Sequence, residues 1–417
     1  MSQLMEQILS RENMLLAYKK VKDNKGVGGI DNISVDEIDE YLKENWEVIK
    51  ERIRNRKYKP QPVLRVEIPK QNGGVRKLGI PTVMDRIIEQ AIVQVITPIV
   101  EPHFSEYSYG FRPGRRAQQA VIKLLEYLND GYIYIVDIDL EKFFDNVPQD
   151  KLMTLVGKII QDPDTESLIA KYLKAGVMDN GKYEETNKGT PQGGNLSPIL
   201  SNIMLNELDK ELEARGLNFV RYADDCVIAV GSSAAANRVM NTITKWIERK
   251  LGLKVNAEKT RTTKPTKLKY LGFGFVKMDG KWEARPHQDS IVKFKSKLKQ
   301  LTKRSWSISM DNRIKRLNWV IRGWINYFRI GKMKTNMIRI DKHLRTRIRI
   351  VIWKQWKTSQ KRMWGLKKLG APEWMARQSV GFNNHYQAVA KTTGVRKITK
   401  EILAKRGLIS CLDYYLN

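Results

Sequence analysis

Two short apolar runs enclose a pair of aspartates in Phe219-Val220-Arg221-Tyr222-Ala223-Asp224-Asp225-Cys226-Val227-Ile228-Ala229-Val230. The β-branched and aromatic residues on both sides predict a strand, a tight turn at Asp224-Asp225 and a second strand. Adjacent carboxylates repel, and each raises the pKa of the other. A divalent cation would remove that cost. For the tetrapeptide alone the alternative is an ordinary Asx turn in a hairpin, so its weight depends on the rest of the chain.

A second acidic strand lies upstream. In Ile135-Val136-Asp137-Ile138-Asp139-Leu140, acids interrupt an apolar run, and the period of two places Asp137 and Asp139 on one face. Phosphodiester synthesis by two metal ions needs carboxylates from separate elements, because the ions lie roughly 3.5–4 Å apart and clamp the attacking and leaving oxygens. Carboxylate oxygens are ligands that Mg²⁺ prefers. The two strands therefore predict a two-metal centre.

Two further segments carry groups that suit a nucleotide. Between the acidic strands lies Gly189-Thr190-Pro191-Gln192-Gly193-Gly194-Asn195-Leu196-Ser197-Pro198. Its glycines permit close approach of another backbone, and Gln192 offers a donor and an acceptor to a base pair or a sugar. Lys70 and Arg76 flank an Asn-Gly-Gly turn, and a hairpin tip with two cations can reach over a triphosphate. The alternatives are a helix-capping loop and a solvated turn.

The chain has 417 residues and a formal net charge of +30, which is unevenly spread. Residues 281–417 hold 33 Lys and Arg against 7 Asp and Glu. Such a field draws in polyanions through counterion release, and aromatic faces beside cations suit nucleic-acid bases. A solubilising surface would mix its charges more, and a face for anionic lipid is the other alternative. Eight tryptophans lie in this basic third: Trp282, Trp306, Trp319, Trp324, Trp353, Trp356, Trp364 and Trp374.

Other chemistries find little support. Cys226 and Cys411 form no CxxC pair, and with four histidines no zinc site is predicted. Residues Met1–Ser10 lack the features of a signal peptide, and no stretch approaches the ~20 apolar residues of a membrane span. We expect a soluble, intracellular protein with reduced thiols and no membrane partner.

Periodicity predicts an α+β fold for roughly the first 280 residues and an all-helical remainder. Strands are expected over 65–70, 75–80, 132–140, 219–223, 226–230 and 269–275. Helices are expected in two pieces of residues 1–60 around the loop 24–29, and over 82–100, 117–129, 150–175, 198–215 and 234–251. After about residue 290 we expect basic helices with breaks near 305–311, 357–361 and 381–384.

Together these segments resemble the reverse transcriptases encoded by bacterial group II introns, in the order of that family and over nearly the whole chain. Residues 24–34 resemble the family's N-terminal extension, and 322–328 resemble its maturase or thumb motif. Each motif is weak alone, but the shared order makes a chance match negligible. The other matching motifs are Arg65–Pro81, Ser108–Arg115, Asp137–Asp145, Gly189–Pro198, Tyr222–Asp225, Leu251–Lys259 and Tyr270–Phe275.

The resemblance implies a right-hand polymerase fold in three domains. Fingers and palm, with an antiparallel sheet, would span residues 1–282, a helical thumb or maturase X domain 283–358, and a small basic DNA-binding region 359–417. Many relatives end in a zinc-bearing endonuclease with clustered cysteines, and this sequence has no such cluster. We therefore expect priming from a nascent DNA strand or with a host nuclease.

The resemblance also implies roles for single residues. Asp139 and Asp224 match the principal metal ligands, with Asp225 assisting, while Asp137 precedes the catalytic position and suits a strand-end carboxylate equally well. Phe144 falls where these enzymes keep an aromatic against the sugar 2′ position, and its neighbour Phe143 could be core instead. The other matched residues are Lys70, Arg76, Leu140 and Gln192 for dNTP binding, and Arg112, Arg115 and Lys259 for template and primer, with Lys259 also a candidate proton donor to pyrophosphate.

The implied activity is RNA-directed DNA synthesis from dNTPs with two Mg²⁺ ions, for which Mn²⁺ can substitute, on an RNA template with a DNA primer. The implied setting is retrohoming of a group II intron in the bacterial cytoplasm, with binding of intron RNA to assist splicing and contact with target DNA. Two alternatives stay open: an RNA-binding splicing cofactor with little polymerase activity, and a related reverse transcriptase recruited to host defence. The oligomeric state does not follow from the sequence.

Overall fold

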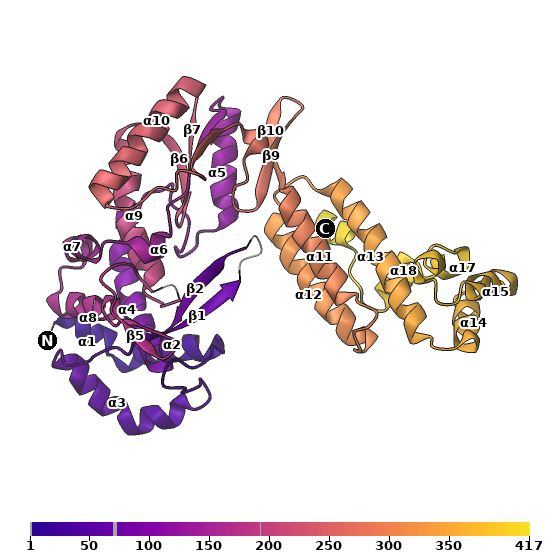
Figure 1. Ribbon diagram of the computed structural model, residues 1–417, viewed down its shortest axis with the longest axis horizontal. Coiled ribbons are helices and arrows are strands. Elements are labelled where there is room, and N and C mark those ends of the chain that lie inside the picture. Colours follow the sequence, from indigo (N-terminus) through magenta and orange to yellow (C-terminus); the bar gives the residue numbers. More distant parts are fainter. Residues whose placement is uncertain (1, 70–72, 192) are drawn as a thin grey trace. The chain divides into compact units, whose positions relative to one another are not determined.

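The computed structural model describes residues 2–69, 73–191 and 193–417. The chain divides into two compact units, Met1–Lys264 and Pro265–Asn417 (Figure 1). Over the described residues, the first unit combines two four-stranded sheets with helices, and the second combines one hairpin with helices. The predicted α+β fold with antiparallel strands and a helical C-terminal region is therefore confirmed. The division by function at residues 282 and 358 stays a prediction.

Half of the α-helices described in the first unit begin at a polar side-chain cap. Ser10 and Thr82 each accept a hydrogen bond from a backbone N–H three residues later, which satisfies a donor left open by the first helical turn. Helix α4 is buried on most of its surface because it contacts α2, α7 and α9. These helices are α1 (Gln3–Ile8), α2 (Arg11–Asp23), α3 (Ile38–Arg54), α4 (Val83–Val100), α5 (Ala117–Asn129), α6 (Phe143–Asn146), α7 (Gln149–Ile160), α8 (Pro163–Leu173), α9 (Ser197–Ala214) and α10 (Ser233–Trp246), which continues as a π turn at Ile247–Leu251.

Two helical predictions were too long, and caps explain both. Residues 1–60 contain three helices rather than two, because Ser10 ends one helix region and caps the next. The predicted helix 150–175 is split between α7 and α8. Gln161 takes a left-handed conformation there, Asp162 caps α8 and Pro163 occupies its first position.

One sheet of the first unit has the strand order β6-β7-β3-β8, with all neighbours antiparallel. Its strands are β3 (Tyr134–Ile138), β6 (Asn218–Tyr222), β7 (Asp225–Val230) and β8 (Arg261–Thr263). The sheet lies against α5, which contacts β6 and β7, and α10, which contacts β3, β7 and β8 (Figure 1). This packing explains why β7 is one continuous apolar run after Asp225. The predicted strand–turn–strand at the two aspartates is confirmed.

The second sheet has the order β2-β1-β4-β5. Strands β1 (Val63–Pro69) and β2 (Val75–Ile80) form the predicted hairpin, with pairing from Leu64↔Ile80 to Pro69↔Val75. Strand β4 (Val177–Asp179) joins β1 in parallel and pairs with β5 (Lys182–Glu184). The Arg65 side chain donates to Asp179 at 3.2 Å and to Glu184 at 2.9 Å, and so ties the hairpin to these short strands.

The second unit begins with the hairpin of β9 (Phe273–Met278) and β10 (Lys281–Pro286). The strand predicted over 269–275 was wrong in its first half, because Leu271 and Gly272 have positive φ and form a tight turn between Tyr270 and Phe273. The three predicted helix breaks fall at boundaries between helices, whereas the breaks at 329–333, 369–372, 390–392, 397–399 and 406–410 were not predicted. The helices are α11 (Gln288–Leu301), α12 (Met310–Phe328), α13 (Lys334–Gln355), α14 (Ser359–Lys368), α15 (Glu373–Gly381), α16 (Tyr386–Val389), α17 (Thr393–Arg396), α18 (Lys400–Lys405) and α19 (Cys411–Leu416).

Aromatic rings form part of the second unit's core. The rings of Phe294 and Trp324 stack with centroids 4.4 Å apart, and Phe328 packs on Trp324. Trp353 is buried and donates its indole N–H to the Asn383 carbonyl at 2.8 Å. The tryptophans of the basic third are therefore not all nucleic-acid contacts, whereas Trp319, Trp364 and Trp374 are exposed. In the described part of the chain no helix has the length and apolar character needed to span a membrane.

Candidate active site

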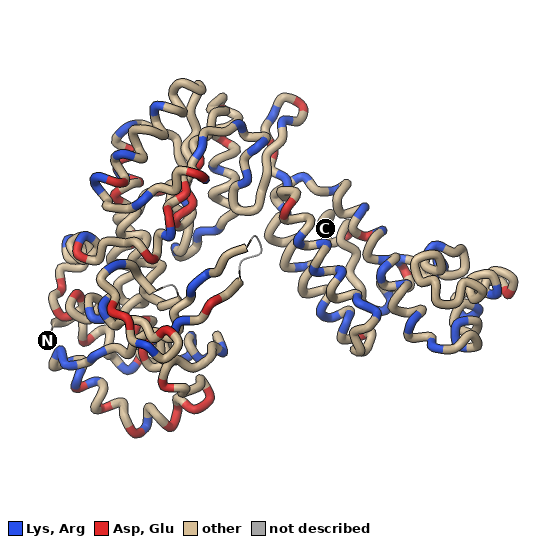
Figure 2. Tube along the Cα trace, in the orientation of Figure 1, with Lys and Arg blue, Asp and Glu red and all other residues tan. Residues whose placement is uncertain are grey.

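Strand pairing brings the predicted acids together. The β3–β7 ladder ends at Ile138↔Cys226, so the next positions along the two strands are Asp139 and Asp225. Directly opposed residues of an antiparallel pair share a face, and alternation places Asp137 on the same face as Asp139. Asp224 lies in the turn that joins β6 to β7. Figure 2 shows this concentration of acidic residues on the strands of the first unit.

The pKa values of Asp137, Asp224 and Asp225 are raised, first by burial and then by neighbouring carboxylates. The pKa of Asp225 is raised to about 6, mainly because burial removes its solvation. The charges of Asp224, Asp137 and Asp139 raise this pKa further. Burial also raises the pKa of Asp137 to about 6, although Arg261 acts in the opposite direction. The pKa of Asp224 is raised, first by burial and then by Asp139, while Arg76 lowers it. A divalent cation would favour the charged form of all these carboxylates.

The carboxylates and the strand register suit a divalent cation, although two of the carboxylates lie beside basic side chains in this structure. No set of three or more His, Cys, Asp or Glu side chains among the described residues converges as metal ligands. The Asp139 carboxylate instead lies 3.3 Å from the ammonium of Lys259, and Asp137 lies 3.8 Å from Arg261. These exposed cations are flexible counter-ions that a metal could displace.

The segment after β3 carries the predicted sugar contact. Leu140 is buried and forms a β-bridge with Val255. Phe143 is buried in the core, which is the alternative that the sequence left open for it, whereas Phe144 is half-buried and meets the Phe143 ring edge-on at 5.2 Å. Phe144 is therefore the aromatic with a free surface.

The glycine-rich loop packs on three elements around this segment. The Thr190 N–H donates to the Phe144 carbonyl at 2.7 Å. A Cβ added at Gly193, which has φ of 122°, would lie 2.4 Å from the Gly79 carbonyl on β2. Buried Glu89 of α4 accepts the Asn195 N–H at 2.5 Å. The loop is thus held against α6, β2 and α4, and only glycine fits at residue 193.

Of the predicted triphosphate and base-pair contacts, Arg76 lies on exposed β2 opposite Ile68. The positive charge of Arg76 lowers the pKa of Asp224. Lys70 and Gln192 lie outside the described residues. Their roles therefore stay predictions.

The two predicted template arginines make internal contacts. Arg112 is buried, and its guanidinium donates to Glu101 at 2.9 Å and to the carbonyls of Ser105 and Ser108. Arg115 donates to the carbonyl and carboxylate of Glu106 and lies 5.5 Å over the Tyr109 ring. Lys259 is more open, with 66% of its side chain exposed.

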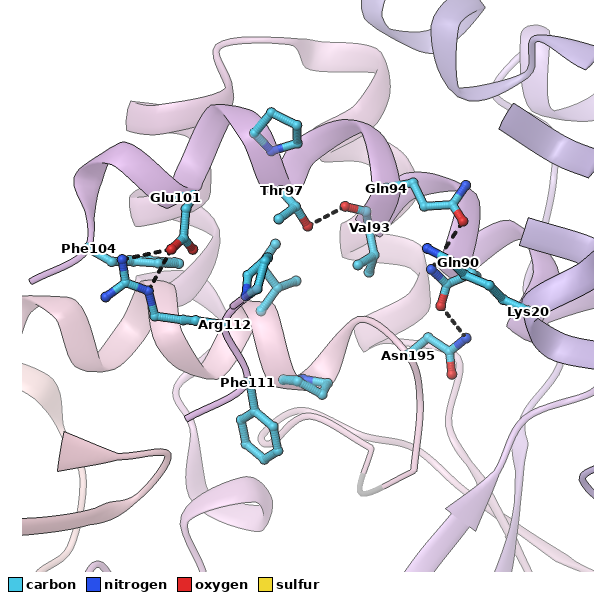
Figure 3. Close-up of a pocket in the computed structure, with 14 residues that line it drawn as sticks. Lys20, Gln90, Val93, Gln94, Thr97, Glu101, Phe104, Phe111, Arg112 and Asn195 are labelled. Carbon is cyan, nitrogen blue, oxygen red and sulfur yellow. Dashed lines mark hydrogen bonds and ion pairs between the residues drawn. The ribbon is translucent and has the colours of Figure 1, made fainter. Parts of the chain in front are cut away.

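A pocket of about 400 Å³ lies on the first unit beside α4 (Figure 3). Gln90, Gln94, Asn195 and Lys20 gather at one side, and the Glu101–Arg112 pair lies at the other. None of the predicted metal ligands lines it, so it is separate from the carboxylate cluster. The remaining lining residues are Val93, Thr97, Pro98, Phe104, Phe111, Pro113, Pro198 and Ile199.

Two protein families match the chain. "Reverse transcriptase (RNA-dependent DNA polymerase)" matches residues 68–275, and "Group II intron, maturase-specific domain" matches residues 291–370. Protein YkfC of Escherichia coli (strain K12) is 32% identical over 286 residues, which cover 60% of this chain and 74% of YkfC. The chain belongs to the group II intron reverse transcriptases.

The matches to two further relatives cover a smaller share of those proteins. Group II intron-encoded protein LtrA of Lactococcus lactis subsp. cremoris is 30% identical over 363 residues, covering 70% of this chain and 60% of LtrA. Putative COX1/OXI3 intron 2 protein of Saccharomyces cerevisiae is 31% identical over 338 residues, covering 66% and 39%. Among solved structures, a telomerase from Candida albicans with a telomeric RNA fragment has a TM-score of 0.42 and 14% identity, over 74% of this chain and 60% of that one.

Four buried polar residues that hold the elements around the carboxylates were not predicted from the sequence motifs. Glu89, Asn202, Asp209 and Arg221 are all buried polar residues with specific partners. A signal was present for Arg221, because an arginine inside an apolar strand needs a buried partner. The partner itself could not be read from the sequence, because it lies on a different element.

Proposed function

We propose that this reverse transcriptase copies intron RNA into DNA by adding dNTPs to a DNA primer during retrohoming. The observation that supports this most is the β3–β7 register, which places Asp139 beside the Asp224–Asp225 turn. Burial and the neighbouring carboxylates raise the pKa of Asp224 and of Asp225, which supports a site that a cation would stabilise. The family match to RNA-dependent DNA polymerases supports RNA as the template.

In this proposal Asp139, Asp224 and Asp225 hold two Mg²⁺ ions, which Mn²⁺ can replace. When bound, such ions lower the pKa of the primer hydroxyl and neutralise the leaving pyrophosphate. The chain's own residues bind and orient the nucleotide. Phe144 would close the space that a ribose 2′-hydroxyl needs. Lys70, Arg76, Leu140 and Gln192 would bind the rest of the dNTP.

Lys259 is proposed to give a proton to pyrophosphate or to contact the primer, because its ammonium lies beside Asp139. Arg115 is proposed as a template contact. The guanidinium of Arg112 donates to the carbonyls of Ser105 and Ser108 within the first unit. We therefore propose that Arg112 affects nucleic-acid binding indirectly, by holding the backbone of residues 105–108.

The test is primer extension on poly(rA)/oligo(dT) with Mg²⁺ for Asp139→Ala and Asp224→Ala. Both variants are expected to lose synthesis to background while they bind template–primer as wild type does. The matched control is Asp150→Ala, an exposed acid in the first turn of α7 that should keep full activity. Continued synthesis by Asp224→Ala would end the polymerase proposal.

We further propose that the second unit binds the parent intron RNA and assists splicing. The maturase-specific match over residues 291–370 and the excess of Lys and Arg on α11, α12 and α13 support this (Figure 2). A splicing cofactor with little polymerase activity is the second candidate function. Asp224→Ala separates the two, because splicing assistance should survive in that variant. We place the protein in the bacterial cytoplasm by similarity to LtrA and propose target DNA as a partner of residues 359–417.

A further inference from the structure

Arg221 is fully buried beside the acidic turn, in a bidentate ion pair with Asp209 of α9. Its Nε donates to Oδ1 of Asp209 at 2.7 Å and its Nη2 donates to Oδ2, and both side chains have 0% exposure. A buried ion pair gains little net stability over apolar packing, because both charges lose their solvation. The planar guanidinium of Arg221 fixes the direction of its hydrogen bonds, which the ammonium of a lysine cannot do. The pair is therefore better explained by geometry than by stability.

The third nitrogen of Arg221 reaches the turn. Nη1 donates to the carbonyl of Ala223 at 2.9 Å and to Oδ1 of Asn202 at 3.1 Å. Asn202 in turn donates from Nδ2 to the carbonyl of Gly110 at 2.9 Å. Asn202 on α9 therefore links Gly110 to Arg221, and Arg221 in turn holds the carbonyl of Ala223, the residue before the two aspartates.

Residues 107–110 also contact Arg221 and Ala223 directly. The Tyr109 N–H donates to the Arg221 carbonyl at 2.8 Å, and the Arg221 N–H donates to the Tyr107 carbonyl at 2.9 Å. A Cβ added at Gly110 would lie 2.2 Å from the Ala223 nitrogen, so only glycine allows this approach. Ala223 itself has φ of 56°, a left-handed conformation that alanine rarely adopts. A strained residue persists only where its surroundings hold it in place.

We propose that Arg221, fixed by Asp209 and Asn202, is a positioning residue that holds the Ala223 carbonyl and with it the carboxylates of Asp224 and Asp225. The inference rests on the proposed function, in which those carboxylates hold the metal ions. Catalytic groups must be held to within a fraction of an ångström by their supporting shell. Arg221 acts through the turn and touches neither substrate nor metal.

The test compares Arg221→Lys and Asn202→Ala with wild type. Lysine keeps the charge but cannot bond Asp209 and Ala223 together, and Asn202→Ala leaves the ion pair intact. We expect kcat to fall about 100-fold for Arg221→Lys and about tenfold for Asn202→Ala, with KM for dNTP and Kd for template–primer within about twofold of wild type. Mn²⁺ affinity, measured by electron paramagnetic resonance without turnover, should weaken about tenfold or more in Arg221→Lys.

Two controls make each outcome decisive. Asp162→Ala removes a buried cap of α8 at a site that does not touch the turn, so it should lower the melting temperature and leave Mn²⁺ affinity unchanged. If Arg221→Lys does not fold, Asn202→Ala carries the test. Wild-type kcat and Mn²⁺ affinity in the folded variants, or a rise in KM alone, would overturn the positioning role. Asp224→Ala is measured in parallel: if it stays active the proposed function fails, and if it is inactive while Asn202→Ala is normal only this inference fails.

Discussion

Glu89 is a carboxylate enclosed by α4 and the glycine-rich loop, where it accepts the N–H of Asn195. Burial raises its pKa to about 8, because the charged form loses its solvation there. An unfolded Glu has a pKa of about 4.3. The folded protein therefore holds a proton on Glu89 over a range of pH in which the unfolded chain has released it.

The sign of the pH dependence follows from that difference. The stability contributed by protonated Glu89 is complete below the unfolded pKa and is lost as pH rises through about 8. Glu89→Gln, which is neutral at every pH, should match wild type near pH 4 and exceed it by about 2–4 kcal/mol in free energy of unfolding near pH 9. Urea denaturation at several pH values measures this. A difference that is independent of pH would refute the assignment.

Phe144 is the residue proposed to exclude a ribose 2′-hydroxyl. Its ring is half-buried against Phe143 and belongs to the same segment as Asp139. Phe144→Val should reduce the preference for dTTP over UTP, measured as a ratio of kcat/KM, by about 10- to 100-fold. The control is Phe143→Val, which should lower the melting temperature and leave the ratio unchanged. An unaltered ratio in Phe144→Val would remove this residue from sugar selection.

Residue chemistry was predictable from the sequence where it depended on neighbours in the chain. The repulsion expected for Asp224-Asp225 is present, because the charge of Asp224 contributes to the raised pKa of Asp225. The support of the turn was not predictable. Asn202 and Asp209 lie on α9 among apolar residues, and only the fold brings them to Arg221.

At the scale of elements, the start of α4 depends on one side chain. The Thr82 hydroxyl accepts the Asp85 N–H at 3.0 Å and donates to the Asp85 carboxylate at 2.8 Å, and both residues are buried. Thr82→Ala should lower the free energy of unfolding by about 1–2 kcal/mol, because the cap and a buried acceptor lose a partner. Thr82→Ser keeps the hydroxyl and should recover most of this in the same denaturation assay. Equal stability of the alanine and wild-type proteins would show that water replaces the cap.

Long periodic elements were predicted well, and short ones were not. Helices α4 and α5 and the β1–β2 hairpin match their predicted ranges closely, because each carries its own apolar pattern. Strands β4, β5 and β8 have three residues each, too few to show alternation. Strand β4 forms because β1 offers it an edge, and β8 because β3 does. Such strands follow from the fold rather than from local sequence.

At the scale of the whole molecule, charge divides the chain into a mixed part and a strongly basic part. Residues 281–417 carry 33 Lys and Arg against 7 Asp and Glu. Binding of intron RNA should therefore weaken steeply with salt, with a slope of log affinity against log salt steeper than about −3. Filter binding across a salt series measures the slope. A flat response would contradict a binding mode based on phosphate contacts.

The C-terminal part allows a companion experiment on the same RNA and DNA. Removing residues 360–417 should weaken target-DNA binding more than it changes KM for dNTPs, because the dNTP contacts are proposed on the first unit. Exposed Trp364, with the Lys368 ammonium 4.9 Å over its ring, lies in the part removed. Equal losses in both quantities would contradict a separate DNA-binding role for this region.

The central claim is that the carboxylates of β3 and of the β6–β7 turn hold divalent ions together. Calorimetric titration of Mg²⁺ into the protein with a chain-terminated primer, RNA template and matching dNTP tests it most directly. The account predicts two bound ions in wild type and in the Asp150→Asn control, and loss of at least one in both Asp139→Asn and Asp224→Asn. Identical stoichiometry and affinity in all four proteins would contradict it.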